Sequence, residues 1–164
     1  IEVLKGMHPA DRGTLLHRCF ELLLDSPELS TRLPELLGEE ISPEESRLIK
    51  GAVQAFNDYL SRQHSPVSLL SEEPFIRLDE NGTVMTGTID LLVEMADGFW
   101  VVDHKSDQLE ISELQERAAH YYPQLAAYAD AVRAVKPDSN VQGIMINWVS
   151  LGMVSVLGGE ADGL

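Results

Sequence analysis

The sequence predicts a single α/β domain, residues 1–164, with a mixed β-sheet flanked by helices. Three observations lead to this class. Hydrophobic residues up to about position 62 recur at helical spacing, whereas from Pro74 onward they alternate, which is the period of a strand. A further helical stretch then separates three alternating segments from two more, which favours a crossover connection. A chain of 164 residues is long enough for one hydrophobic core and short for two.

Two helices are expected before the strands. Asp11 can cap the first, which runs to about Asp25. Its hydrophobic side chains lie at helical spacing: Leu15, Leu16, Cys19, Leu22 and Leu23. Residues 26–41 contain prolines and a glycine, and they predict a connection with a short helical turn. The segment Ser42-Pro43-Glu44-Glu45 predicts the start of the second helix, to about Arg62, because serine caps, proline suits the first position and glutamate the third.

The strands and the last helix follow in order. Residues 75–79, 84–95 and 99–105 predict an antiparallel meander, because Asn81-Gly82 and Asp97-Gly98 are dipeptides of tight β-turns. The pattern Ser112-Glu113-Leu114-Gln115 predicts a capping box that opens a helix to about Val135, interrupted or kinked at Pro123. Residues 141–150 and 153–157 alternate again and predict two further strands.

Three charged residues fall on one face of the predicted hairpin. A two-residue turn at Asp97-Gly98 sets Asp90 opposite Lys105, and the alternation of side chains puts Asp103 on the same face. An ion pair across a half-exposed hairpin would explain these charges. So would a divalent cation, which we favour because one lysine leaves the second carboxylate uncompensated. The other face is expected to be core: Ile89, Leu91, Val93, Met95, Trp100 and Val102.

Four short motifs occur in a recognisable order. They are Gly13-x-x-x-His17, Gly87-Thr88-Ile89-Asp90, Val102-Asp103-His104-Lys105-Ser106, and Tyr121-Tyr122-Pro123-Gln124 with Tyr128. Together they resemble the RecB/AddA-type branch of the PD-(D/E)XK nucleases, over about residues 13–157. The resemblance implies the restriction-endonuclease-like fold of that superfamily. It also implies a metal-dependent DNA exonuclease that hydrolyses phosphodiester bonds during DNA-end processing and recombinational repair.

The resemblance further implies which residues bind the metal ion. Asp90, Asp103, His17 and the backbone carbonyl of His104 would bind Mg²⁺, with Mn²⁺ as the alternative. Lys105 would orient the attacking water and stabilise the charge that develops on the phosphate. His104 stands where tyrosine is common in the branch. If it contributes only its carbonyl, its side chain is expected to matter little.

Two further positions follow from the resemblance. Gln124 and Tyr128 stand four residues apart on one helix face, with Tyr121 three residues before Gln124, so they can reach the active site or the DNA strand together. Glu72 falls where the branch often has an acidic residue near the metal, and Glu73 is the alternative. Ser106 stands where threonine is common, which removes no ligand.

Composition limits the partners and the compartment. A formal net charge of −15 argues against unaided capture of DNA. The resemblance implies that a helicase domain of the same chain, with a further subunit, delivers the strand, and the start without methionine predicts a C-terminal fragment of such a chain. A single cysteine, Cys19, excludes an internal disulfide and the iron–sulfur cluster of the four-cysteine variants, and fits a reducing cytoplasm. No apolar run approaches the ~20 residues of a membrane helix.

Alternatives remain open at this point. The chain could be a catalytically inactive nuclease-fold scaffold or DNA-binding module in a helicase complex, although such modules generally lose an acidic residue or the lysine. An unrelated binding domain would need four motif matches by chance. His17 could be an ordinary helix histidine, and Gln124 and Tyr128 could be polar surface groups beside a core stripe.

Overall fold

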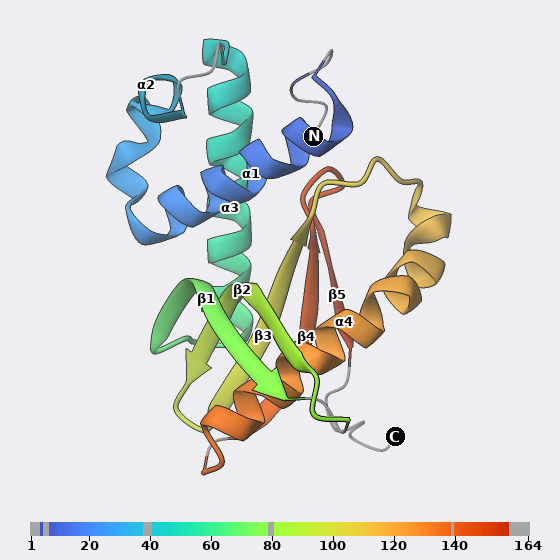
Figure 1. The fold of residues 1–164 in the computed structure, drawn as a ribbon. Helices are drawn as coiled ribbons and strands as arrows, with labels where there is room; N and C mark the ends of the chain where they lie inside the picture. The colour runs from blue at the N-terminus through green and yellow to red at the C-terminus, as the bar shows by residue number, and fades with distance from the viewer. Residues whose placement is uncertain (1–3, 5–6, 38–40, 79–80, 139, 158–164) are drawn as a thin grey trace, which may run out of the picture.

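A computed structural model describes residues 4, 7–37, 41–78, 81–138 and 140–157. The elements in chain order are α1 (Pro9–Asp25), the 3₁₀ helix η1 (Pro27–Thr31), α2 (Leu33–Leu37), α3 (Pro43–Gln63), β1 (Ser68–Leu78), β2 (Val84–Met95), β3 (Gly98–Lys105), the 3₁₀ helix η2 (Ile111–Glu113), α4 (Leu114–Val135), β4 (Val141–Trp148) and β5 (Met153–Leu157) (Figure 1). No helix among these residues is long and apolar enough to cross a membrane.

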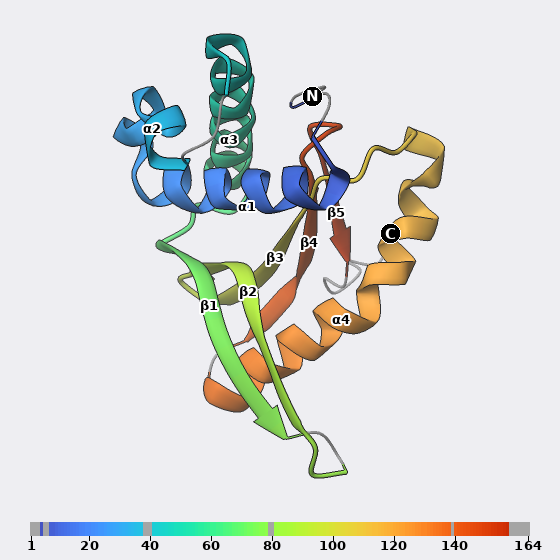
Figure 2. The same cartoon turned by 45° about the horizontal axis from the view of Figure 1, so that its top comes forward.

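The five strands form one sheet in the order β1-β2-β3-β4-β5. Neighbouring strands are antiparallel except β3 and β4, which run parallel and are connected by α4. One hydrophobic cluster joins α1 and α3 to one face of the sheet, and a second joins α4 to the other face (Figures 1 and 2). The predicted α/β class with a mixed sheet between helices is confirmed.

The first two long helices begin at strong sequence signals. The predicted capping box of α3 is present: Ser42 Oγ accepts the Glu45 N–H, and the Glu45 carboxylate accepts the Ser42 N–H at 2.9 Å. The predicted start of α1 at Asp11 is wrong. His8 caps the helix by accepting the Ala10 N–H, and Pro9 occupies the first turn, where its missing N–H costs no hydrogen bond.

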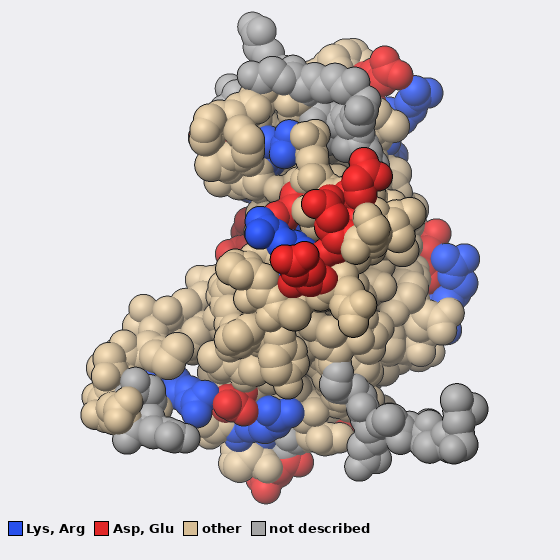
Figure 3. Space-filling view, turned by 90° about the vertical axis from the view of Figure 1, so that its right-hand side faces the viewer, with Lys and Arg blue, Asp and Glu red and all other residues tan. Residues whose placement is uncertain are grey.

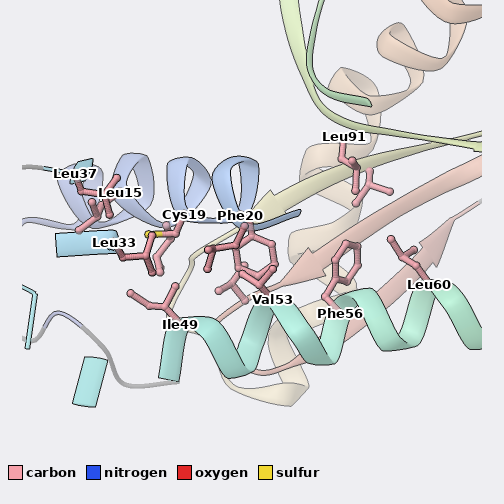
Figure 4. Close-up of a cluster of buried hydrophobic side chains, with 14 of the residues drawn as sticks. Leu15, Cys19, Phe20, Leu33, Leu37, Ile49, Val53, Phe56, Leu60 and Leu91 are labelled. Atoms are coloured by element: carbon pink, nitrogen blue, oxygen red, sulfur yellow. The ribbon is translucent and has the colours of Figure 1, made fainter. Parts of the chain in front are cut away.

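The cluster between α1 and α3 forms the larger core. The hydrophobic stripe of α1 meets that of α3, and both cover the sheet at Leu91 (Figure 4). Cys19 and Leu91 are both 0% exposed, so Cys19 is part of this core. Burial of such side chains is the main stabilising contribution to the domain. The labelled members are Leu15, Cys19, Phe20, Leu33, Leu37, Ile49, Val53, Phe56, Leu60 and Leu91.

The predicted register of the β2–β3 hairpin is wrong by two residues. Met95 pairs with Gly98, so the turn is at Ala96-Asp97 and not at Asp97-Gly98. Gly98 is needed for a different reason: a Cβ there would lie 2.2 Å from the Asn140 carbonyl oxygen, and its φ is 153°. A shift of two residues does not by itself move a side chain to the other face of a strand. Asp103 and Lys105 therefore remain together, although Asp90 no longer lies opposite Lys105.

Two other boundaries differ from prediction. Strand β1 begins at Ser68 and continues through Pro74, because β1 is an edge strand, where a missing N–H is tolerated; Asp79, the predicted end, lies outside the described residues. Helix α4 continues through Pro123 as one helix, so of the two predicted outcomes, an interruption or a kink, the interruption is wrong. The predicted Ser112 cap is also replaced, since the Glu110 N–H donates to the Glu113 carboxylate at 2.7 Å.

Candidate active site

Strands β2 and β3 separate at the end of the hairpin away from its turn. Their pairing runs only as far as Leu91 and Val102, whereas β3 stays paired with β4 as far as Lys105. One residue beyond the last pair, Asp90 Oδ2 accepts the backbone N–H of His104 at 2.8 Å. The carboxylate thus replaces a strand carbonyl as the acceptor. This separation of the strands creates room for polar side chains inside an otherwise hydrophobic sheet.

Asp103 and Lys105 form a buried ion pair beside Asp90. Asp103 Oδ2 lies 2.6 Å from Lys105 Nζ, and the two side chains are 4% and 16% exposed. The contact lacks hydrogen-bond geometry, so Asp103 Oδ2 has no hydrogen-bond partner among the described residues. Burial and the charge of Asp90 raise the pKa of Asp103 to about 6. Burial by itself would lower the pKa of Lys105, but the charge and close contact of Asp103, together with the charge of Asp90, raise it above its usual value. The site therefore carries more negative charge than one lysine compensates.

Helix α1 brings His17 to the same place. His17 Nδ1 lies 3.4 Å from Asp90 Oδ2. One turn earlier, a Cβ at Gly13 would lie 3.1 Å from Ser106 Oγ, so the glycine allows close approach of α1 to the segment after β3. Burial alone would lower the pKa of His17, but its hydrogen bond to Asp90 and the nearby carboxylate charges raise it. The Gly13-x-x-x-His17 spacing thus has a packing reason for both of its residues.

The side chain of His104 points into the core. It is 3% exposed, and its ring lies 4.5 Å from that of Phe20 and 5.3 Å from that of Phe56. Burial lowers the pKa of His104 to about 3, so the ring is neutral, and Asn147 Nδ2 lies 3.0 Å from its Nδ1. This side chain fills a closely packed position between α1 and α3, so it should contribute to stability, and the expectation that it matters little for the chemistry stays a prediction.

Glu72, and not Glu73, faces the site. Glu72 lines a pocket with His17, Glu21 and Asp90, whereas Glu73 lines another pocket with Asp25. Glu72 has a φ of 53°, an uncommon conformation for glutamate, at the point of β1 next to Asp90. Burial and the charges of Asp90 and Glu21 raise the pKa of Glu72. The irregular backbone at Glu72 and Asp90 also explains Ile89, which packs on the α4 face and not, as predicted, with Leu91.

Gln124 and Tyr128 lie on α4, on the other side of the sheet from His17. Gln124 Nε2 donates to the Tyr128 hydroxyl, and the Tyr128 ring packs 5.2 Å from that of Phe75. No hydrogen bond or ion pair in the described chain joins either residue to the acidic pair. The residue of α4 that contacts the charged group is Tyr121, whose ring centre lies 4.4 Å from Lys105 Nζ.

Sequence reasoning grouped Tyr121 with the residues that can reach the site, but it missed the hydrogen bonds that Tyr121 and Arg117 make to Asp107. The Tyr121 hydroxyl donates to Asp107, which also accepts two hydrogen bonds from the Arg117 guanidinium. Arg117 and Tyr121 stand one turn apart on α4, a spacing that could have suggested a common partner. The partner could not be identified, because Asp107 belongs to the irregular segment between β3 and η2, whose path the sequence does not predict.

The donor set suits a hard divalent cation. His17 Nδ1 and Asp90 Oδ2 are 3.4 Å apart, close to the separation of about 3 Å between adjacent ligands of an octahedral Mg²⁺. Asp103 supplies a buried carboxylate oxygen without a hydrogen bond. The described residues contain no set of three or more His, Cys, Asp or Glu side chains arranged to hold a metal ion, because Asp103 is turned toward Lys105. By the chemistry of their donor atoms, His17, Asp90 and Asp103 fit such an ion.

Comparison with known proteins identifies the family. The family model of the PD-(D/E)XK nuclease superfamily matches residues 3–153, nearly the whole chain. A search of curated proteins finds no significant match. The mixed five-stranded sheet flanked by helices agrees with the restriction-endonuclease-like core of that superfamily. Its members hydrolyse phosphodiester bonds and generally use divalent metal ions. The chain belongs to the PD-(D/E)XK nuclease superfamily.

Proposed function

We propose that the protein is a Mg²⁺-dependent deoxyribonuclease of the RecB/AddA type that degrades DNA from its ends, with Mn²⁺ as a possible substitute. The observation that carries the proposal is the pair of carboxylates, the partly buried Asp90 and the buried Asp103, which lie beside Lys105. Buried charge is costly unless it is paired or bound to metal. The excess negative charge here is the kind that a divalent cation neutralises.

The metal ligands in this proposal are Asp90, Asp103, His17 and the backbone carbonyl of His104. When bound, the ion supplies a Lewis acid for the phosphate oxygen and lowers the pKa of water. The chain itself contributes the remaining steps. Asp90 holds the His104 backbone through its N–H, and the Lys105 ammonium donates hydrogen bonds to the attacking water and to the phosphate. Water then displaces the 3′ oxygen of the scissile bond, leaving a 5′ phosphate.

The proposal also gives roles to residues of α4 and β1. Gln124 and Tyr128 support each other by a hydrogen bond and are proposed to contact the DNA strand. Glu72, which lines the pocket with His17 and Asp90, is proposed to act near the metal.

The partner in this proposal is a helicase domain of the same chain, with a further subunit, working in the cytoplasm during DNA repair. The support is electrostatic. The net charge is −15, and on the face seen in Figure 3 the lysine and arginine side chains lie next to acidic ones and form no continuous basic surface. Non-specific DNA affinity depends on such basic surfaces. A tethered motor would raise the effective concentration of the strand without local affinity.

The test is cleavage of linear single- and double-stranded DNA with Mg²⁺, with Mn²⁺ or without metal. We expect Lys105→Ala and Asp90→Asn to lower the rate by about 10²- to 10³-fold, as loss of one electrostatic group does elsewhere. Lys50→Ala on the exposed face of α3 and Asp97→Asn in the exposed turn are matched controls that keep the parental rate. Metal-dependent cleavage that is unchanged in both site variants would refute the proposal.

A second measurement addresses delivery by a motor. We expect the chain alone to bind single-stranded DNA weakly at physiological salt, because its net charge is −15. Tight binding under these conditions, measured by fluorescence anisotropy, would remove the reason for a delivering partner.

A further inference from the structure

Tyr121 lies against Lys105, the lysine of the proposed site. The Lys105 ammonium is over its ring, 4.4 Å from the centre. On its other side Lys105 contacts Asp103 at 2.6 Å. The negative face of an aromatic ring attracts an ammonium group, and the attraction grows when water is excluded. Lys105 is only 16% exposed, so it is held between a carboxylate and a ring.

The ring itself is fixed from several directions. The Tyr121 hydroxyl donates to both oxygens of Asp107, each at 3.1 Å. Asp107 in turn accepts from Arg117 at 2.8 Å and 3.1 Å. The ring of Trp148, which is 1% exposed, lies 6.2 Å from the Tyr121 ring. Trp148 is the cross-strand neighbour of Lys105. Tyr121 therefore connects α4 to the ends of β3 and β4.

Lysine needs such support more than most groups with this role. Its ammonium sits on a flexible four-carbon stem, and immobilising it costs side-chain entropy. One anchor, Asp103, is itself a proposed metal ligand, and a ligand committed to an ion is a weaker partner for lysine. The second anchor is the ring, which carries no charge and binds no metal. The ring can hold the Lys105 ammonium whether Asp103 contacts Lys105 or binds a metal ion.

Building on the proposed function, we propose that Tyr121 is a positioning residue, whose ring face holds the Lys105 ammonium beside Asp103. The competing explanation is that Tyr121 only fastens α4 to the sheet through its hydroxyl and Asp107. The two explanations assign importance to different parts of the same side chain, the ring and the hydroxyl.

Two substitutions separate these explanations in the intact protein. Tyr121→Phe keeps the ring and removes the hydroxyl, and Tyr121→Leu removes both. We expect Tyr121→Leu to lower kcat about tenfold with KM within about twofold, and Tyr121→Phe to keep kcat near the parental value. Tyr122→Leu is the matched control, since Tyr122 is exposed and lines a different groove with Val156. Equal losses of kcat in the Phe and Leu variants would overturn the proposal in favour of the hydroxyl.

A labelling experiment tests the positioning without any nuclease activity. Reductive methylation, followed by mass spectrometry, measures how accessible each lysine is. We expect Tyr121→Leu to increase labelling of Lys105 several-fold and Tyr121→Phe to leave it unchanged. Lys50, which is exposed, and Lys136, which lies 4.7 Å from the ring centre of Phe99, are internal controls that stay constant.

The two experiments fail in different ways. Unchanged labelling of Lys105 in Tyr121→Leu overturns the positioning role, whatever the activity. An inactive parent protein with the expected labelling pattern overturns the proposed nuclease and leaves the contact between ring and ammonium established.

Discussion

The two ends of the β2–β3 hairpin are built on the same pair of strands and differ in almost everything else. From Met95–Gly98 to Leu91–Val102 the strands pair residue by residue, and most of the side chains are buried hydrocarbon, with the half-buried Glu94 as the charged exception. One residue further, the pairing stops and the Asp90 carboxylate takes the place of a backbone acceptor. The paired end thus supplies stability, and the open end encloses charge that the fold does not neutralise by itself.

This contrast indicates that stability and reactivity are separated along the hairpin. Buried hydrophobic groups and a complete ladder stabilise the fold, whereas buried charges destabilise it unless a partner arrives. Substitutions at the paired end should therefore change the free energy of unfolding, and substitutions at the open end should change mainly activity and the response to metal. The following predictions test this separation, from the largest expected effect on stability to the smallest.

Leu91→Ala removes a fully buried side chain at the last pair of the ladder. We expect the free energy of unfolding to fall by about 3 kcal/mol, because a cavity replaces packed hydrocarbon. Urea denaturation followed by circular dichroism measures this loss. Activity per folded molecule should stay near the parental value. A variant as stable as the parent protein, or one that is folded but inactive, would contradict the separation.

Asp90→Ala and Asp90→Asn distinguish the two tasks of this carboxylate. Both remove its charge, and both should lower the cleavage rate by about 10²- to 10³-fold. Only the alanine variant leaves the His104 N–H without an acceptor, so we expect it to be less stable than the asparagine variant by about 2 kcal/mol. Thermal and urea unfolding compare the two. Equal stabilities would mean that the His104 N–H finds water or another acceptor.

Added Mg²⁺ should stabilise the protein at high pH more than at low pH. The Asp103 pKa is raised from 3.8 to about 6, so its proton stabilises the metal-free fold at low pH, and this contribution is lost as pH rises through about 6. At pH 8 an ion at ten times its dissociation constant raises the free energy of unfolding by about 1.4 kcal/mol. At pH 5.5 protons on Asp103 and His17 compete with the ion, and the gain should be smaller.

Differential scanning calorimetry at the two pH values, with sodium chloride at matched ionic strength as control, measures this gain. An equal gain at both values, or the same gain in Asp90→Asn, would show that the ion binds elsewhere.

Gly13→Ala and Gly51→Ala compare two helix glycines in different surroundings. A Cβ at Gly51 meets nothing within 4 Å, whereas one at Gly13 meets Ser106 Oγ at 3.1 Å. We expect Gly51→Ala to stabilise the protein by about 0.8–1 kcal/mol, the difference in helix propensity. Gly13→Ala should gain less and should lower activity, because α1 also carries His17. Equal gains in thermal stability in the two variants, with unchanged activity in Gly13→Ala, would show that Gly13 is not needed to position α1.

The fold class and the membership of the charged group were predictable from local patterns. Hydrophobic periodicity located every long helix and strand, and the capping box at Ser42 located the start of α3. The alternation of side chains grouped Asp90, Asp103 and Lys105, and they do lie near one another even though the hairpin register was wrong. This prediction was robust because an error of two residues, unlike an error of one, does not change the face of a strand.

Contacts between distant segments decided the rest. Gly98 is required because the Asn140 backbone lies close to it, and not because of the turn. No local sequence pattern distinguishes a glycine required by packing from one required by a turn. Glu72 was distinguished from Glu73 by an irregular backbone beside Asp90. Tyr121 meets Lys105 only because α4 crosses that face of the sheet. The sequence by itself determined which residues share an element and a face, since this follows from the period of the backbone. Only the tertiary structure decided which elements meet and where the strands part, because those outcomes depend on packing between segments far apart in the chain.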